Sequence, residues 1–387
     1  MITHSCSTEL KESLADLETQ AEIKDDTISL LYQANKNIHV NMKTPFGLTD
    51  QLVVDEAVLQ GEVWGSALAS NQVDTFGKEM VEDNLPFIFK YKGYIPVPIL
   101  GQIDDTIGVT EAGFKADQLN SFMNVKTADK YLQFGQDKCK AMLVGKRTSS
   151  FHTPVLQVDT WKTKYLEDGK LVEEFNGKKP MEMTTELTYL GVQLSQSGSN
   201  LNTIHKKRNK EIGKKKQIQN LLKPLGNFTF ECGFIFFNSI VRNSVLYGTE
   251  VMYNMIEKEK REIEKIEEGH LRSIFQANTG IQVPIHLMYL DGGQVPARYQ
   301  ISRFRVNFLH YILQQEEQSL LCSMLRAQQN SPTKGDWLSA TMTNISEMGI
   351  NLSNYEIKHM KKEKFHKITK ENSEYLAFTN LRAKQQN

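Results

Sequence analysis

Apolar and polar residues follow two different periods along this chain of 387 residues. Residues 9–35 place apolar side chains among charges at helical spacing, which predicts one or two amphipathic helices. The period then changes to two between Ile38 and Met42, and this alternation predicts a strand. A turn at residues 45–47 and a second strand at residues 52–54 are predicted to follow.

The next stretch combines two predicted helices with several short strands. One helix begins after Gly61 and extends to about Asp83, and the other covers residues 112–128. Between them, residues 87–110 consist of short apolar runs separated by turn residues, such as those of "YKGY". This arrangement predicts a meander of short antiparallel strands.

Helical spacing dominates the rest of the chain after a last group of strands. These strands are predicted over residues 139–145, 154–166, 170–175 and 187–195. From Asn202 onward, apolar residues recur at spacings of three, four and seven. Two helix faces are predicted from this spacing, one with Ile256, Ile263, Ile266 and Ile274, and the other with Ile301, Phe304, Phe308 and Tyr311.

The two periods together indicate an α+β fold. Residues 1–198 are predicted to form an antiparallel sheet with helices, and residues 199–330 a helical region. Residues 331–387 are predicted to form a helical, basic segment, and the sequence leaves open whether this segment is flexible. The change from strands to helices is expected within residues 195–203, "SQSGSNLNT".

Composition excludes some functions without choosing one. The chain has 40% apolar and 24% charged residues and no formal net charge, so any surface for nucleic acid must be local. Its four cysteines show no C-x-x-C spacing, which argues against a zinc knuckle or a disulfide framework and favours a reducing, intracellular compartment, cytoplasmic or nuclear. The most apolar window, residues 232–241, is too short to span a membrane, and the polar N-terminal residues are unlike a signal peptide.

Two adjacent carboxylates, Asp104 and Asp105, interrupt the apolar runs of the predicted meander. Aspartate is common in turns because it bonds to nearby backbone and tolerates unusual backbone angles, so a plain turn is one interpretation. A metal site is the other, because two like charges at a hairpin tip repel each other and a divalent cation relieves that repulsion. Such hard oxygen ligands suit Mg²⁺ or Mn²⁺.

Four segments, in order, resemble motifs of the reverse transcriptases of non-LTR (LINE-type) retrotransposons. Residues 102–105 are similar to the metal-binding hairpin of these enzymes, with Gln102 where an aromatic residue is usual. The other three are the Gln-Gly segment "AVLQGEVWGSALASNQVD", the lysine-bearing segment "LQFGQDKCKAMLVGK" and the Leu-Gly strand "LTYLGVQLS" at the base of the thumb. The likeness covers residues 10–320 and is strongest over residues 45–195.

The resemblance implies a partial polymerase palm followed by a mostly α-helical thumb and extension. It assigns Asp104 as the main ligand of a two-metal centre with Mg²⁺ or Mn²⁺, and Asp105 as its helper. Gln60 and Gly61 would lie beneath the template and the incoming nucleotide. Lys138 would lie near the triphosphate and protonate the leaving pyrophosphate. The alternative interpretation of Lys138 is a solvated surface lysine. The implied substrates are an RNA template, a DNA primer and dNTPs.

One catalytic carboxylate of this family has no counterpart in the sequence. In the family it ends a strand ahead of the helices predicted over residues 9–35, and residues 1–7 contain no carboxylate. Asp16, Asp25 and Asp26 follow no strand pattern and are interpreted as helix-surface or helix-terminal residues. The sequence is therefore expected to be the C-terminal part of a reverse transcriptase, without fingers, and inactive by itself.

Two basic runs, residues 205–216 and 358–370, are candidates for contact with nucleic acid. A charge run is usually a solvated helix face. In a polymerase, however, the thumb follows the template-primer backbone, where its lysines and arginines neutralise phosphates and release the counterions bound to them. The resemblance assigns this role to Lys206, Lys207, Arg208, Lys214, Lys215 and Lys216. The acidic runs "EKEKREIEKIEE" and "QQEEQ" balance this charge and are expected to face away from nucleic acid.

Two functions from different classes remain open. The first is an RNA-directed DNA polymerase, and the second is a remnant that binds nucleic acid without catalysis. The histidines do not change this choice, because His359 and His366 lack partners at metal-ligand spacing. His270 continues the apolar stripe of Ile266 and Ile274 and is expected to be a partly buried core residue.

Overall fold

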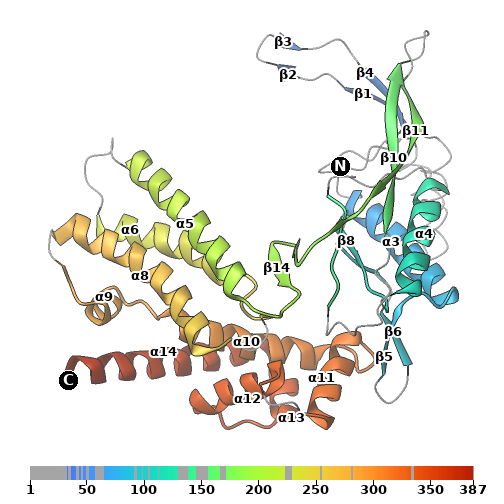
Figure 1. The fold of residues 1–387 in the computed structure, drawn as a ribbon. Helices are drawn as coiled ribbons and strands as arrows, with labels where there is room; N and C mark the ends of the chain where they lie inside the picture. Colours follow the sequence, from blue (N-terminus) through green and yellow to red (C-terminus); the bar gives the residue numbers. More distant parts are fainter. Residues whose placement is uncertain are drawn as a thin grey trace. The chain divides into compact units, whose positions relative to one another are not determined.

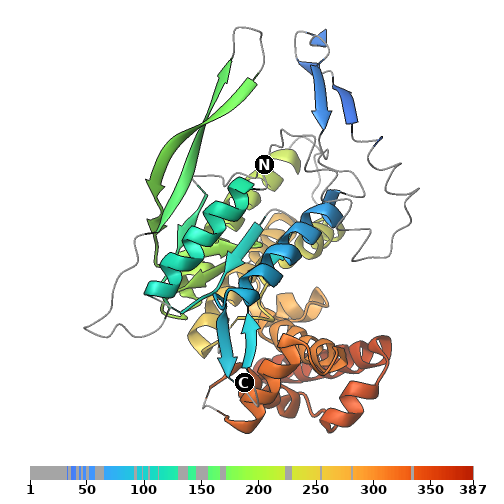
Figure 2. The same cartoon turned by 90° about the vertical axis from the view of Figure 1, so that its right-hand side faces the viewer.

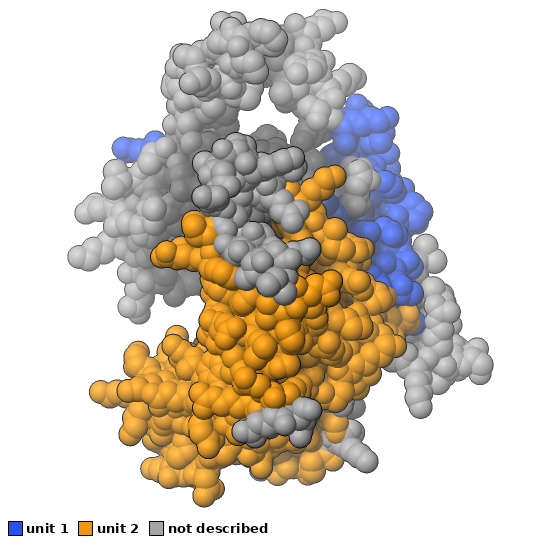
Figure 3. All heavy atoms as spheres, turned by 90° about the vertical axis from the view of Figure 1, so that its left-hand side faces the viewer, with its two compact units in different colours: residues 1–187 blue, residues 188–387 orange. Residues whose placement is uncertain are grey.

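The computed structural model divides the chain into two compact units, residues 1–187 and residues 188–387 (Figure 3). Each unit is described by itself. The described residues are 33, 36–40, 43–44, 47–48, 52–56, 65–90, 94–97, 99–102, 105–111, 113–129, 138–144, 156–165, 171–222, 229–252, 255–279, 282–332 and 335–386. The helices predicted over residues 9–35 lie outside them, apart from residue 33.

In its described residues, the first unit contains short strands and two helices (Figure 1). Its helices are α3 (Gly65–Glu82) and α4 (Phe114–Asp129). Its strands are β1 (Lys36–Val40), β2 (Lys43–Thr44), β3 (Gly47–Leu48), β4 (Leu52–Glu56), β5 (Phe87–Lys90), β6 (Tyr94–Val97), β7 (Ile99–Gln102), β8 (Asp105–Gly108), β9 (Lys140–Ala141), β10 (Gln157–Tyr165), β11 (Leu171–Pro180) and β12 (Glu182–Met183). The two helices match those predicted from helical spacing.

The strands of this unit associate in pairs. Within the described residues, antiparallel pairs join β1 to β4, β2 to β3, β5 to β6, β7 to β8 and β10 to β11. The longest pair is β10–β11, in which Trp161 lies opposite Phe175. The two rings pack edge to face, with 5.7 Å between their centroids. Only β9 and β12 pair in parallel among the described strands. The mixed helix and antiparallel strand content confirms the predicted α+β class.

The segment predicted as one Leu-Gly strand is two strands with a turn between them. β13 (Glu186–Tyr189) pairs with β14 (Val192–Ser195), and the boundary between the units falls within β13. Leu190 and Gly191 connect them with φ of +46° and +76°. Positive φ at both central residues is the geometry that matches the twist of a tight hairpin. The alternating sequence pattern continues through the turn, so it could not reveal this break.

The second unit continues from this hairpin as helices. They are α5 (Leu201–Leu222), α6 (Phe230–Phe236), the π-helix η2 (Phe237–Arg242), α7 (Asn243–Leu246), α8 (Glu257–Thr279), α9 (Ile285–Asp291), α10 (Ala297–Gln314), α11 (Leu320–Asn330), α12 (Trp337–Glu347), α13 (Asn354–His359) and α14 (Lys362–Gln386). The change from strand to helix falls between Ser195 and Leu201, inside the predicted range. None of the described helices combines the length and apolar character that crossing a bilayer requires.

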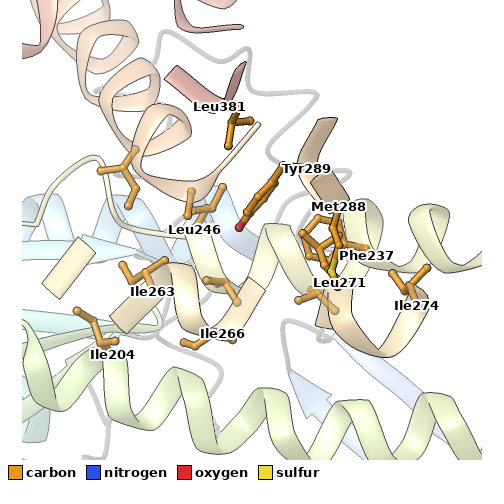
Figure 4. Close-up of a cluster of buried hydrophobic side chains, with 14 of the residues drawn as sticks. Ile204, Phe237, Leu246, Ile263, Ile266, Leu271, Ile274, Met288, Tyr289 and Leu381 are labelled. Carbon is orange, nitrogen blue, oxygen red and sulfur yellow. The ribbon is translucent and has the colours of Figure 1, made fainter. Parts of the chain in front are cut away.

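A first core joins α5, η2 and α7–α10 to the end of α14. Figure 4 shows Ile263, Ile266 and Leu271 of α8 close to side chains from the neighbouring helices. Ile263, Ile266 and Ile274 are buried, as their spacing predicts. Ile256 was assigned to the same face, but it precedes α8 and is 53% exposed. The helix begins one residue later, so the periodicity does not extend to Ile256.

A second core holds the C-terminal helices together. It contains Phe365 and Ile357, both fully buried, with Trp337 and the far half of α10. Residues of the segment 331–387 are therefore packed into the core of the unit. On α10, Tyr311 is 51% exposed although it was predicted to share the buried face. That helix is buried on two sides, so its core residues do not follow one stripe.

The acidic run of α8 is largely buried. Glu259, Glu264, Glu267 and Glu268 are each at most 8% exposed. Each is paired within the unit: Glu259 accepts from the backbone and side-chain amides of Asn200 at 3.0 and 3.1 Å, and Glu264 accepts from Arg298. Buried charges need such partners because leaving water is costly. These acids are therefore structural, which the charge pattern alone did not indicate.

One ion pair of this group is almost fully excluded from solvent. Arg242, at the end of η2, donates to Glu267 at 3.1 Å, to the Gln294 side chain at 2.9 Å and to the Val295 carbonyl at 2.8 Å. Burial raises the pKa of the Glu267 carboxyl, and the Arg242 charge partly offsets this rise. The pair joins η2 and α8 to the loop before α10.

Two glycines in the left-handed region provide a matched test of packing in the second unit. A Cβ added at Gly248 (φ +75°) would lie 2.8 Å from Val192 Cγ2, whereas one added at Gly349 (φ +67°) would meet nothing within 4 Å. We expect Gly349→Ala to lower the free energy of unfolding by about 1–2 kcal/mol through backbone strain. Gly248→Ala should lower the free energy of unfolding by about 1–3 kcal/mol more than Gly349→Ala does, because the added methyl group overpacks against Val192. Urea unfolding measures both losses. Equal costs would mean that Val192 moves away without penalty.

Candidate functional site

The acidic pair lies at an antiparallel hairpin, as the flanking apolar runs predicted. β7 pairs with β8 in a register that places Gln102 opposite Asp105 and Ile99 opposite Gly108. Asp105 is thus the first residue of β8. Asp104 is one of the two residues between the strands, and it lies outside the described residues.

The base of this hairpin is fixed to the strand pair that precedes it. The Phe87 amide at the start of β5 donates to the Val109 carbonyl at 2.9 Å. The Thr110 hydroxyl donates to the Leu85 carbonyl at 2.9 Å. At Gly108, a side chain would come within 3.2 Å of Leu119 on α4. These contacts hold the end of β8 close to α4 and to the start of β5.

Two helices support the hairpin. α3, blue in Figure 2, packs against β7 and contacts α4, shown in teal. On α3, Phe76 and Met80 are buried, and Glu79 pairs with Lys126 of α4 at 2.7 Å. The Asn124 side chain of α4 donates to the Gln157 carbonyl at the start of β10 at 2.8 Å. The hairpin is therefore held at its base by packed helices.

The remaining predicted palm residues are not gathered at this hairpin by any described contact. Gln60 and Gly61 lie outside the described residues. Lys138 is exposed in a turn before β9. The next residue, Cys139, is partly buried, and burial raises the pKa of its thiol, which disfavours a reactive thiolate. Among the described residues, no three histidine, cysteine, aspartate or glutamate side chains form a metal-binding group.

The basic run of residues 205–216 lies on α5, where some of its charges serve the fold. The Lys207 ammonium donates to the carbonyls of Ser244, Val245 and Tyr247 at 3.2, 3.0 and 2.6 Å. It therefore caps the C-terminal end of α7, a position where a cation is favourable. Burial lowers the pKa of Lys207 to about 8. The assigned role in phosphate contact does not suit this lysine.

Three further members of the assigned set also have partners inside the unit. Lys215 donates to the Gly269 carbonyl at 3.2 Å, Lys214 pairs with the buried Glu211 at 2.9 Å, and Arg208 lies 3.7 Å from Glu262. Lys206, Arg208 and Lys216 have exposed side chains. The side chains of these three are more exposed than those of Lys207 and Lys215, and Arg208 combines its exposure with the ion pair to Glu262.

His270 occupies the partly buried position predicted for it on α8. Burial lowers its pKa to about 4, with smaller contributions from the nearby charges of Glu211, Lys215 and Lys214. The imidazole is therefore neutral near pH 7. This agrees with the packing role expected for it.

Sequence reasoning missed a cavity of about 650 Å³ within the second unit. Its lining comes from α7 and the turn after it, from α10 and from α14. Arg303, His310, Lys362, His366 and Lys370 supply its basic groups. The basic run of residues 358–370 was a signal for it, but the contribution of α10 depends on the tertiary structure.

No model of a known protein family matches the chain, and no curated protein matches it. The likeness to retrotransposon reverse transcriptases therefore stays a prediction from the sequence motifs.

Proposed function

We propose that the chain is part of an RNA-directed DNA polymerase of the non-LTR retrotransposon type, with a partial palm and a helical thumb. The observation that carries the proposal is the β7–β8 hairpin, in which Asp105 begins β8 opposite Gln102 and directly follows Asp104. The order of the four motifs along the sequence is the second support. In this proposal an RNA template, a DNA primer and dNTPs are the partners.

The hairpin fits a divalent metal by its donor chemistry. Asp104 and Asp105 are consecutive in the sequence and carry carboxylate oxygens, which are hard ligands, and Asp105 begins one of two paired strands. Mg²⁺ or Mn²⁺ bound there would activate a primer 3′-hydroxyl and neutralise charge on the leaving pyrophosphate. The protein's own contribution is the β7–β8 pair, whose end at Gly108 and Val109 lies beside α4 and β5.

The helical unit fits the role of a thumb through exposed cations on α5. Lys206, Arg208 and Lys216 expose positive charge along this helix. Lys207 and Lys215 hold the helix to α7 and α8 by bonding backbone carbonyls. Thus the basic run divides into residues that position the helix and residues that could meet a phosphate backbone.

Binding of Mn²⁺ by the full chain tests the metal site. We expect Asp104→Asn with Asp105→Asn to abolish the strongest Mn²⁺ binding seen by electron paramagnetic resonance titration. The matched control is Glu82→Gln with Asp83→Asn, which removes two adjacent exposed acids at the end of α3 and should leave the binding unchanged. Wild-type protein without Mn²⁺ binding, or equal losses in both variants, would refute the proposed metal site.

A second candidate is a non-enzymatic remnant that binds nucleic acid through the helical unit. The observation that favours it is the count of carboxylates, because the sequence motifs supply only two acids for a centre that normally uses three. This candidate predicts binding of a template-primer without nucleotide incorporation.

A further inference from the structure

The cavity of the second unit combines positive charge with aromatic and amide side chains. It lies between the end of α7, the middle and end of α10, and the first turns of α14. Every residue that lines it belongs to the second unit. The inference drawn from it therefore needs neither the hairpin nor the proposed polymerase function.

Cations outnumber acids in the lining. Arg303, Lys362 and Lys370 contribute positive charge, and Glu250 is the one acidic residue of the lining. Glu374 lies outside the lining, at 3.9 Å from Lys370. Lys362 makes no ion pair with any residue in the described part of the chain. The cavity is therefore suited to an anionic group.

Arg303 has an unused donor beside this cavity. Its Nε atom is buried and has no hydrogen-bond partner in the described structure. Its guanidinium lies over the ring of Phe304, with 5.2 Å between Cζ and the ring centroid. A buried donor without an acceptor is costly, and an anion bound at this guanidinium would lower that cost through its negative charge. Arginine favours phosphate and carboxylate groups in this way.

The aromatic lining offers a surface for a flat ring. Tyr311 is half exposed and stacks on Phe308, with ring centroids 5.9 Å apart and planes 15° from parallel. Tyr247, also half exposed, lines the cavity as well. An exposed ring backed by a second ring is well placed to stack with a nucleic-acid base.

Two amide side chains give the cavity polar groups of defined direction. The Asn307 oxygen accepts from the Thr369 hydroxyl at 2.8 Å, so its amino group is left as the donor. The Gln314 amino group donates to the Met360 carbonyl at 3.2 Å, so its oxygen is left as the acceptor. One donor and one acceptor match the mixed hydrogen-bonding edge of a base.

We propose that this cavity binds a phosphorylated nucleoside, either a free nucleotide or a nucleotide within a single strand. The phosphate meets Arg303, Lys362 and Lys370, and the base stacks on Tyr311 with its edge toward the two amides. An apolar ligand does not suit the cations, and an acidic peptide would leave the aromatic surface unused.

Isothermal titration of the full chain with AMP tests this assignment. We expect AMP to bind, and Lys362→Gln with Lys370→Gln to weaken binding at least tenfold. The matched control is Lys364→Gln with Lys367→Gln, because these lysines are exposed on the same helix but do not line the cavity. The control should bind AMP within twofold of wild type. Tyr311→Ala should weaken binding about tenfold through lost stacking.

Further ligands separate this proposal from its competitors. Adenosine should bind at least tenfold more weakly than AMP, and a hexaglutamate peptide should not compete with AMP. If an oligodeoxyadenylate of eight nucleotides binds more tightly than AMP, the ligand of the site is a nucleotide within a single strand. If it binds more weakly than AMP, the ligand is a free nucleotide. Absence of AMP binding, equal losses in the two lysine variants, or competition by the peptide would overturn the proposal. Asp104→Asn with Asp105→Asn should leave AMP binding unchanged, so this test is independent of the metal site.

Discussion

Purified chain of 387 residues should incorporate no detectable dNTP on an RNA template with a DNA primer, in either Mg²⁺ or Mn²⁺. The reason is the number of carboxylates, because Asp104 and Asp105 are the two that the resemblance assigns to the metal centre. Water can fill coordination positions on Mg²⁺, but it does not supply the negative charge that keeps two divalent cations close together. The measurement is extension of a labelled primer on a denaturing gel, with an active reverse transcriptase as the positive control.

The same preparation should bind the template-primer weakly, with an affinity that falls steeply as salt rises. Exposed cations on α5, such as Lys206 and Lys216, would release counterions from the phosphates. Salt-sensitive binding of the template-primer without nucleotide incorporation would support the interpretation of the chain as a non-enzymatic remnant that binds nucleic acid. Robust incorporation that disappears in Asp104→Ala would show that the chain is an active polymerase and that Asp16, Asp25 or Asp26 supplies the third carboxylate.

Arg242→Met should lower the free energy of unfolding of the second unit by about 3–5 kcal/mol. The substitution leaves the fully buried Glu267 carboxylate without its cation and removes the donors to Gln294 and Val295. Breaking one side of a buried pair is costly because the remaining charge is desolvated and unpaired. Urea unfolding followed by far-ultraviolet circular dichroism measures this loss in the helical transition.

The chain provides its own control for this result. Arg208 and Glu262 form another arginine–glutamate pair between helices, at 3.7 Å, in which the Arg208 side chain is 54% exposed. Arg208→Met should cost less than about 1 kcal/mol, because exposed pairs are weak. Adding Glu267→Gln to Arg242→Met should restore part of the lost stability by removing the unpaired charge. Equal costs for the two arginine substitutions would contradict a special role for burial.

Local pattern was sufficient for most of the strand and helix positions. The alternation that begins at Ile38 corresponds to β1, and the apolar runs around the acidic pair correspond to β7 and β8. Helical spacing likewise located α3 and α4. These elements follow from side chains that repeat every two or about every 3.6 residues, a property that neighbouring residues carry by themselves.

Charge runs were the features that local pattern could not interpret. The acids of α8 are buried, although a run such as "EKEKREIEKIEE" resembles a solvated helix face. Glu259, Glu264 and Glu267 have partners in distant parts of the sequence, namely Asn200, Arg298 and Arg242, whereas Glu268 pairs with Arg261 of the same run. In the same way, Lys207 bonds carbonyls at the end of α7. Whether a charge is solvated depends on which element packs against it, and the charge run itself does not contain that information.

The sequence by itself determined the α+β class, the hairpin at the acidic pair and the point near Leu201 where strands give way to helices. The tertiary structure alone decided which lysines of α5 are structural, where the Leu190–Gly191 turn divides a strand pattern, and that α7, α10 and α14 together line a basic cavity. Periodicity is a local property, so a single segment suffices to show it. Burial, ion pairing and cavities arise between segments that are far apart in the chain, and they exist only once those segments are packed.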